Sequence, residues 1–245
     1  MVRAKAARSR ETPAPALRAL RSEVALANCI IEHFGLSRAF GHASARIPGS
    51  NRFLFPTRRS PAFAEERQLL VLDTDGRVLS GKGMPNSELW IHARIYATRP
   101  EVGGIVHAHP PSCICLTQIG QPHRIVHNHG GAFHDGVPEY ERIGLIRTRE
   151  LGDELARSLG SRLAIMMRGH GITTAARDLR RATIAALYLE ESAALQLTML
   201  AASGGDAARL RSYTREEAER VADQLAAPVL ERAWEYYAVK AAAKR

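Results

Sequence analysis

Two histidines separated by one residue, His107 and His109, are the clearest candidates for a chemical role in this 245-residue chain. They follow the apolar run 104–106, which is typical of a short strand, and Pro110 would end any strand pairing. Side chains alternate between the two faces of a strand, so residues two apart point to the same side. Two imidazoles side by side at a strand end provide half of a metal site.

A third histidine follows a second strand-like region, the apolar run 163–167. Gly169 and Gly171 flank His170, and a glycine on each side frees the backbone around that side chain. Three imidazoles with one open position are the arrangement that a catalytic zinc or manganese ion uses. The alternative is that these are packed, hydrogen-bonded histidines, since the chain has ten histidines in all.

Several short segments occur in a characteristic order. They are Gly41-His42-Ala43-Ser44-Ala45-Arg46, Pro85-Asn86-Ser87-Glu88, Arg99-Pro100-Glu101-Val102, Val106-His107-Ala108-His109-Pro110 and Arg168-Gly169-His170-Gly171, with His92 and Tyr96 between them. Together they resemble the class II aldolase/adducin family, from around residue 20 to around residue 235. The resemblance implies that His107, His109 and His170 bind one divalent metal ion, zinc or manganese. It also implies that Glu88 is the catalytic acid/base carboxylate.

Glu88 has a second explanation that the residues alone favour. It stands at the start of a predicted helix, where a negative charge is stabilised by the helix N-terminus. The resemblance instead implies that Glu88 exchanges a proton with a substrate carbon. His92 lies on the same helix face as Glu88 and is expected to be a structural hydrogen-bond partner rather than a metal ligand.

The chain differs from the sugar-phosphate aldolases of this family at the positions that hold phosphate. Those enzymes use an asparagine, a Thr/Ser-Gly turn and a Ser-Ser pair. This chain has His42, then Arg58 and Arg59 in the turn, then Asn86 and Ser87. An arginine could hold a carboxylate through two parallel hydrogen bonds, although either arginine alone could be a solvated loop residue. The expected substrate-binding residues are His42, Arg58, Arg59, Asn86, Ser87 and His129, the last in a histidine-rich loop that could equally lie on the surface.

The Gly-His-Ala-Ser start and the histidine-rich loop resemble one branch of the family. That branch decarboxylates hydroxylated aromatic or ring-opened dicarboxylates, such as dihydroxyphthalate and carboxymuconic semialdehyde. The resemblance therefore implies a divalent-metal-dependent carbon–carbon lyase, specifically a decarboxylase that stabilises an enolate. One alternative is an aldolase or epimerase acting on a sugar phosphate. Another is a non-enzymatic binding domain as in adducin, against which the retained histidines and Glu88 argue.

Composition limits the other possibilities. The chain is 45% hydrophobic, and we find no internal linker or repeat. We therefore expect a single domain over residues 15–245, preceded by a disordered basic tail at residues 1–14. No apolar run approaches the ~20 residues that span a bilayer. We recognise no nucleic-acid-binding motif in the sequence. The net charge of +9 suits an anionic small-molecule substrate instead, because a positive field steers anions into a cleft.

Two further expectations concern location and assembly. Three cysteines cannot all pair; Cys113 and Cys115 are expected to be buried thiols, and a reduced cytoplasmic setting follows. The aromatic residues Trp234, Tyr236 and Tyr237 near the chain end suit either a core or an interface. The related enzymes are homo-oligomers, so the resemblance implies a homotetramer or larger assembly.

The pattern of apolar residues and turn signals also predicts the elements that must position these side chains. Helices are expected at 16–34, 87–99, 148–159, 179–202, 214–226 and after Pro228, and strands at 43–46, 52–55, 69–73, 77–79, 104–109 and 163–167. Short strands with helices between and after them favour an α/β or α+β sandwich. The resemblance implies an α/β/α three-layer sandwich whose central sheet is mainly antiparallel.

Overall fold

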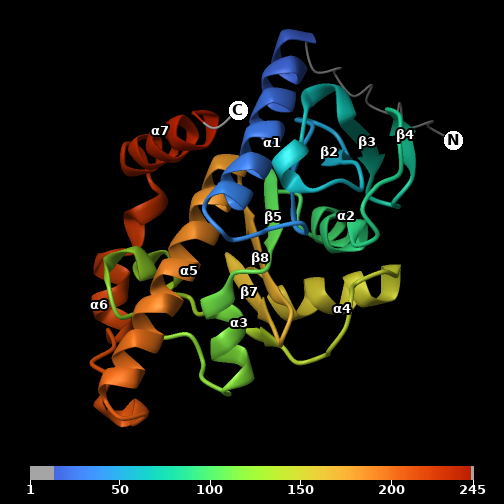
Figure 1. Ribbon diagram of the computed structural model, residues 1–245. Coiled ribbons are helices and arrows are strands. Elements are labelled where there is room, and N and C mark those ends of the chain that lie inside the picture. Colours follow the sequence, from blue (N-terminus) through green and yellow to red (C-terminus); the bar gives the residue numbers. More distant parts are fainter. Residues whose placement is uncertain (1–13, 244–245) are drawn as a thin grey trace, which may run out of the picture.

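The computed structural model describes residues 14–243 and contains an eight-stranded sheet between two layers of helices (Figure 1). The strands are β1 (His42–Arg46), β2 (Arg52–Pro56), β3 (Leu69–Asp73), β4 (Val78–Ser80), β5 (Gly104–Ala108), β6 (Glu139–Tyr140), β7 (Ala164–Met167) and β8 (Gly171–Ala176). Their order across the sheet is β4-β3-β2-β1-β5-β8-β7-β6, and only the β6–β7 pair is parallel. The predicted three-layer sandwich with a mainly antiparallel sheet is confirmed.

The helices agree with the predictions except at α3 (Pro111–Gln118) and α6 (Arg215–Arg220). The helices are α1 (Ala14–His33), α2 (Leu89–Thr98), α3 (Pro111–Gln118), α4 (Arg149–Leu159), α5 (Leu179–Ala202), α6 (Arg215–Arg220) and α7 (Val229–Ala242), with 3₁₀ turns at Pro61–Phe63, Glu66–Gln68, Asn128–Phe133, Ala207–Arg209 and Ala222–Leu225. The predicted helix 214–226 is shorter, because α6 ends at Arg220 and a 3₁₀ turn follows. Neither α3 nor β8 was expected. Cys115, on α3, is exposed rather than buried, whereas Cys113 is buried as expected.

Each face of the sheet has its own hydrophobic core. Helices α1, α3, α5 and α7 cover one face, and α2 and α4 cover the other (Figure 1). Consecutive residues of β5 therefore enter different cores: Ile105 packs in the core beneath α2, and Val106 packs in the core beneath α1 and α5. This alternation decides which side chains of β1 and β5 face α2, where Glu88 precedes the first turn.

Two expectations concern the chain end and membranes. The predicted tail at residues 1–14 lies outside the described residues, apart from Ala14, which begins α1. Within residues 14–243, no helix combines the length and the apolar character needed to cross a bilayer.

Asn28 of α1 holds the start of β1 in place from the face of the sheet that lies away from α2. Its amide nitrogen donates to the Ala43 carbonyl at 3.1 Å, and its oxygen accepts from the Ala43 N–H at 3.0 Å. Ala43 lies beyond the part of β1 that pairs with β2, which covers only Ala45 and Arg46. The buried Asn28 side chain therefore replaces a missing strand neighbour.

Replacing this side chain should destabilise the protein. Asn28→Ala leaves a buried N–H and a buried C=O of Ala43 without partners, so the free energy of unfolding should fall by about 2 to 5 kcal/mol. Urea denaturation measures this change. Thr198→Ala is the matched control, because the Thr198 hydroxyl bonds only within α5, to the Ala194 carbonyl. Equal losses in the two variants would contradict the role given to Asn28.

Candidate functional site

Strand pairing places His42 and His107 next to each other. They are Cα partners in the β1–β5 ladder, and their ring centroids lie 5.1 Å apart. Both are buried on the side of the sheet that faces α2. His109 follows one residue after β5 ends, where its backbone N–H donates to the Leu36 carbonyl at 2.8 Å.

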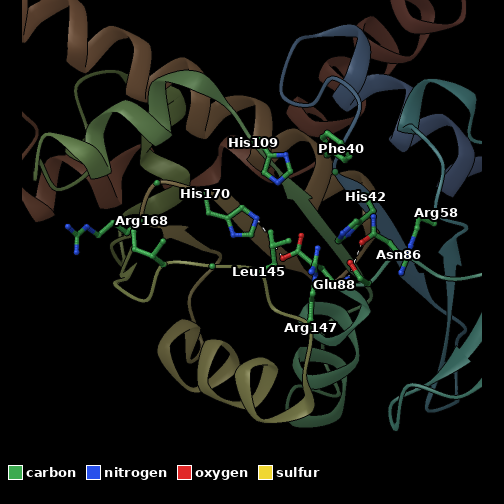
Figure 2. Close-up of a pocket in the computed structure, with 15 residues that line it drawn as sticks. Phe40, His42, Arg58, Asn86, Glu88, His109, Leu145, Arg147, Arg168 and His170 are labelled. Atoms are coloured by element: carbon green, nitrogen blue, oxygen red, sulfur yellow. Dashed lines mark hydrogen bonds and ion pairs between the residues drawn. The ribbon is translucent and has the colours of Figure 1, made fainter.

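The three histidines of the predicted metal site come together. The ring centroid of His107 lies 4.9 Å from those of His109 and His170, and the last two are stacked at 5.1 Å. With Glu88 they form a group whose potential ligand atoms all lie within 4.8 Å of one another. Figure 2 shows His109, His170 and Glu88 around one space.

Hydrogen bonding in this group fits a bound cation. His107 Nδ1 lies 2.9 Å from the Ile172 carbonyl, so this nitrogen carries the proton and Nε2 has a lone pair. His107 Nε2 is 3.1 Å from His109 Nε2, and His109 has a backbone hydrogen bond with Phe40. Both ring nitrogens of His170 are buried without a hydrogen-bond partner. Buried polar atoms rarely stay unsatisfied, and a divalent ion among the three rings would bind one of these two nitrogens.

His107 and His109 are also in the protonation state that a metal ion requires. Burial, reinforced by the neighbouring imidazoles His109 and His170, holds the pKa of His107 well below its usual range. Burial and then His170 lower the pKa of His109 to about 4. These two rings are therefore neutral near pH 7, and their lone pairs are available to a cation.

The turn that carries His170 depends on its glycines. His170 lies in the tight turn between β7 and β8, and Gly169 adopts a φ of +62°. A Cβ on Gly171 would lie 2.1 Å from the Ala108 carbonyl oxygen, so only glycine allows β8 to approach β5 here. The predicted reason for the Gly-His-Gly sequence, backbone freedom around the histidine, agrees with this geometry.

Glu88 points toward the histidines rather than back to its helix. It is the N-cap residue of α2, yet its side chain makes no capping bond. The carboxylate accepts from the Ile146 N–H at 2.9 Å and lies 3.7 Å from His170 Nε2 and 3.9 Å from His107 Nε2. Asn86 supplies the local bond instead, since its Oδ1 accepts from the Glu88 N–H at 3.0 Å. The alternative of a simple helix-terminus carboxylate therefore does not describe this side chain.

A cavity of about 700 Å³ opens beside this group (Figure 2). Four predicted substrate-binding residues line it: His42, Arg58, Asn86 and Ser87. The sequence analysis missed the residues that the loop before α4 and other segments contribute to the lining: Phe40, Ile143, Leu145, Arg147 and Arg168. Arg168 had a signal, because it adjoins the Gly-His-Gly turn, but Figure 2 shows its guanidinium directed away from Glu88.

Two predicted substrate-binding residues lie elsewhere. Arg59 does not line the cavity, and its guanidinium lies 5.8 Å from the ring centroid of Phe63. His129 is stacked on Tyr188 at 4.1 Å, and its Nδ1 pairs with Glu191 at 2.9 Å, so within this chain it is remote from the cavity. His92 is not a ligand of the metal group; its two ring nitrogens bond to His42 and Ser44.

Comparisons with known proteins agree with this geometry. Residues 22–197 match the family described as "Class II Aldolase and Adducin N-terminal domain". A 3,4-dihydroxyphthalate decarboxylase of Arthrobacter keyseri is 34% identical over 203 residues, which are 75% of this chain and 80% of the relative. An L-fuculose phosphate aldolase of Methanococcus maripaludis is 28% identical over 166 residues, 65% of this chain and 85% of that protein. The solved structure of an aldolase II superfamily protein from Pseudomonas syringae superposes with a TM-score of 0.81 at 22% identity over 95% of each chain.

Metal analysis tests the site directly. The protein should bind one divalent ion, and His107→Ala and His170→Ala should each lose it, because each removes one of three imidazole ligands. Elemental analysis of purified, dialysed protein measures the ion. His134→Ala is the control, since His134 lies outside the cavity, and it should keep the metal. Full metal occupancy in both site variants would refute the assignment.

Proposed function

Because this chain belongs to the class II aldolase and adducin family, we propose that it is a divalent-metal-dependent lyase that decarboxylates a hydroxylated dicarboxylate. The observation that carries the proposal is the cluster of three imidazoles with Glu88 beside a cavity. Three ligands leave an open position for substrate oxygens. The proposed ion is zinc or manganese.

The chemistry requires a place for negative charge. A divalent ion held by His107, His109 and His170 would supply a Lewis acid for the charge that develops when a carbon–carbon bond breaks. In a decarboxylation the carbon–carboxylate bond breaks, carbon dioxide leaves, and the electron pair stays on the substrate carbon as an enolate. A proton must then reach that carbon. Glu88 lies beside the imidazoles, where its carboxyl group can deliver this proton and later regain one from solvent.

The cavity also offers groups for a second carboxylate. Arg58 lines it, and Figure 2 shows this side chain on the far side of His42 and Asn86 from His170. A guanidinium can hold a carboxylate through two parallel hydrogen bonds. Asn86 lies between Arg58 and Glu88 in Figure 2, and Ser87 also lines the cavity, so a substrate that spans the two would pass Asn86.

The relatives named above include a decarboxylase and an aldolase. An aldolase acting on a sugar phosphate is therefore the second candidate function. Two observations favour the decarboxylase. Two 3,4-dihydroxyphthalate decarboxylases are 34% and 32% identical over 75% and 71% of this chain, whereas the L-fuculose phosphate aldolases compared with them are 27 to 31% identical over 56 to 65%. The cavity also has a histidine and an arginine, His42 and Arg58, at positions where the aldolases are expected to use an asparagine and a glycine for phosphate. An adducin-like binding role is not supported by any feature of the cavity.

Substrate assays test the proposed reaction. Metal-loaded protein should release carbon dioxide from 3,4-dihydroxyphthalate or a related hydroxylated dicarboxylate, and should act poorly on L-fuculose 1-phosphate. Glu88→Gln keeps the shape of the side chain but not its acid, so kcat should fall by about 10² to 10⁴ while the metal stays bound. Carbon dioxide capture and metal analysis measure the two effects. Aldehyde release from the sugar phosphate in place of carbon dioxide would favour the aldolase.

The two adjacent arginines provide a matched pair of variants. Arg58→Ala should lower kcat/KM on the dicarboxylate by roughly tenfold or more, because a charge-assisted hydrogen bond is lost. Arg59→Ala should change it by no more than about twofold, since this side chain lies outside the cavity. Steady-state kinetics on the same substrate decide between them. An equal effect of both changes, or no effect of either, would contradict the assigned role of Arg58.

The proposal includes a homo-oligomer, a tetramer or larger, of one domain over residues 15–245 in the cytoplasm. Exposed apolar side chains occur near the cavity mouth and on α7: Phe40, Ile143, Leu145, Tyr236 and Val239. Association would remove them from water. Multi-angle light scattering at micromolar concentration should give at least four times the 26.9 kDa chain mass. A monomer at that concentration would refute this part of the proposal.

A further inference from the structure

Four buried polar side chains form a chain of hydrogen bonds that leads from the cavity wall into the protein. His42 Nδ1 lies 2.7 Å from His92 Nε2, and His92 Nδ1 lies 2.6 Å from Ser44 Oγ. The Tyr96 hydroxyl lies 2.9 Å from Ser44 Oγ and 3.0 Å from the Ser44 carbonyl oxygen. All four residues are at most 2% exposed, and only His42 lines the cavity.

The distances indicate which atoms carry the protons. Hydrogen bonds donated by a hydroxyl are shorter than those donated by an N–H, about 2.7 Å against about 2.9 Å. The 2.6 Å contact therefore fits a Ser44 hydroxyl that donates to His92 Nδ1. The His92 proton is then on Nε2 and is donated to His42 Nδ1. Tyr96 can donate to either oxygen of Ser44, which leaves the Ser44 proton for His92.

We infer that this chain fixes His42 with its proton on Nε2, the ring nitrogen left to the cavity, and so makes His42 a hydrogen-bond donor to a substrate carboxylate. His107, its partner across the ladder, is held in the opposite tautomer by the Ile172 carbonyl. The strand pair thus presents a lone pair to a cation from one histidine and an N–H to an anion from the other. A protonated Nε2 also explains why His42, so close to His107, does not act as a further metal ligand.

His92, Ser44 and Tyr96 are accordingly positioning residues, which act through His42 and do not touch the substrate. The donor role of His42 rests on the proposed function, because it presumes a carboxylate in the cavity. The tautomer does not rest on it, since the hydrogen bonds that set the tautomer lie behind the cavity wall. The two parts can therefore fail separately.

Nitrogen-15 NMR of histidine-labelled, zinc-loaded protein measures the tautomer, with the His42 signals assigned by their loss in His42→Gln. We expect the Nε2–H form in the wild type and a mixture of forms in Ser44→Ala. Ser192→Ala should leave His42 unchanged; it is the matched control because Ser192 Oγ bonds a partly buried histidine, His123, at 2.9 Å. An Nδ1–H form in the wild type, or an unchanged His42 in Ser44→Ala, would overturn the relay. If Ser44→Ala fails to fold, His92→Phe removes the same constraint.

Calorimetric binding of phthalate, a dicarboxylate that needs no turnover to be measured, tests the donor role. His42→Phe should weaken binding about tenfold, and His42→Gln, which retains an N–H donor, should recover most of that loss. Phthalate binding that is unchanged in His42→Phe, or that is absent in the wild type, would overturn the donor role. Carbon dioxide release by a protein whose phthalate binding is unchanged in His42→Phe would refute the donor role and sustain the decarboxylase. A fixed Nε2–H tautomer in a protein that releases no carbon dioxide would sustain the tautomer and refute the decarboxylase.

Discussion

The site depends on three clustered imidazoles whose nitrogen lone pairs need a positive charge among them. His107 and His109 face each other through nitrogens 3.1 Å apart, and His107 cannot donate from that nitrogen because its proton is held by the Ile172 carbonyl. His170 adds two more buried nitrogens without partners. A cation placed among the three rings would take one nitrogen lone pair from each of them. The strands of the sheet and the start of α2 hold the three rings and Glu88 in this arrangement.

The sheet provides that geometry through contacts on both of its faces. The β1–β5 register sets His42 beside His107, and the bonds of Asn28 to Ala43 anchor the beginning of β1 from the other face. On the α2 side, Glu88 turns away from its helix because the Ile146 N–H holds its carboxylate. Gly171, the first residue of β8, permits the close approach of β8 to Ala108, which brings His170 to the group. Three separate segments of the chain therefore meet in one place.

Much of this could be predicted from local sequence, and the remainder could not. Alternation along a strand predicted that His107 and His109 lie together, and capping residues such as Asp178 marked the starts of helices. The strand β8 was missed because Gly171–Ala176 has a single bulky apolar residue, Ile172, and because α5 and the neighbouring strands, rather than a local pattern, bury it. Local sequence also could not tell which of Arg58 and Arg59 lines the cavity, because the directions of two adjacent side chains in a turn are set by the tertiary structure around them. Arg147 reaches the cavity from a distant loop, for which the sequence offers no periodic signal.

The most direct test of the account is the ligand environment of the bound metal, measured by X-ray absorption on zinc-loaded protein. The account predicts an inner shell of nitrogen and oxygen at about 2.0 to 2.1 Å, with the multiple scattering of three imidazole rings. In His170→Ala, any zinc that remains should show only two rings. A spectrum without imidazole scattering, or one that His170→Ala leaves unchanged, would contradict the claim that these three histidines share a cation.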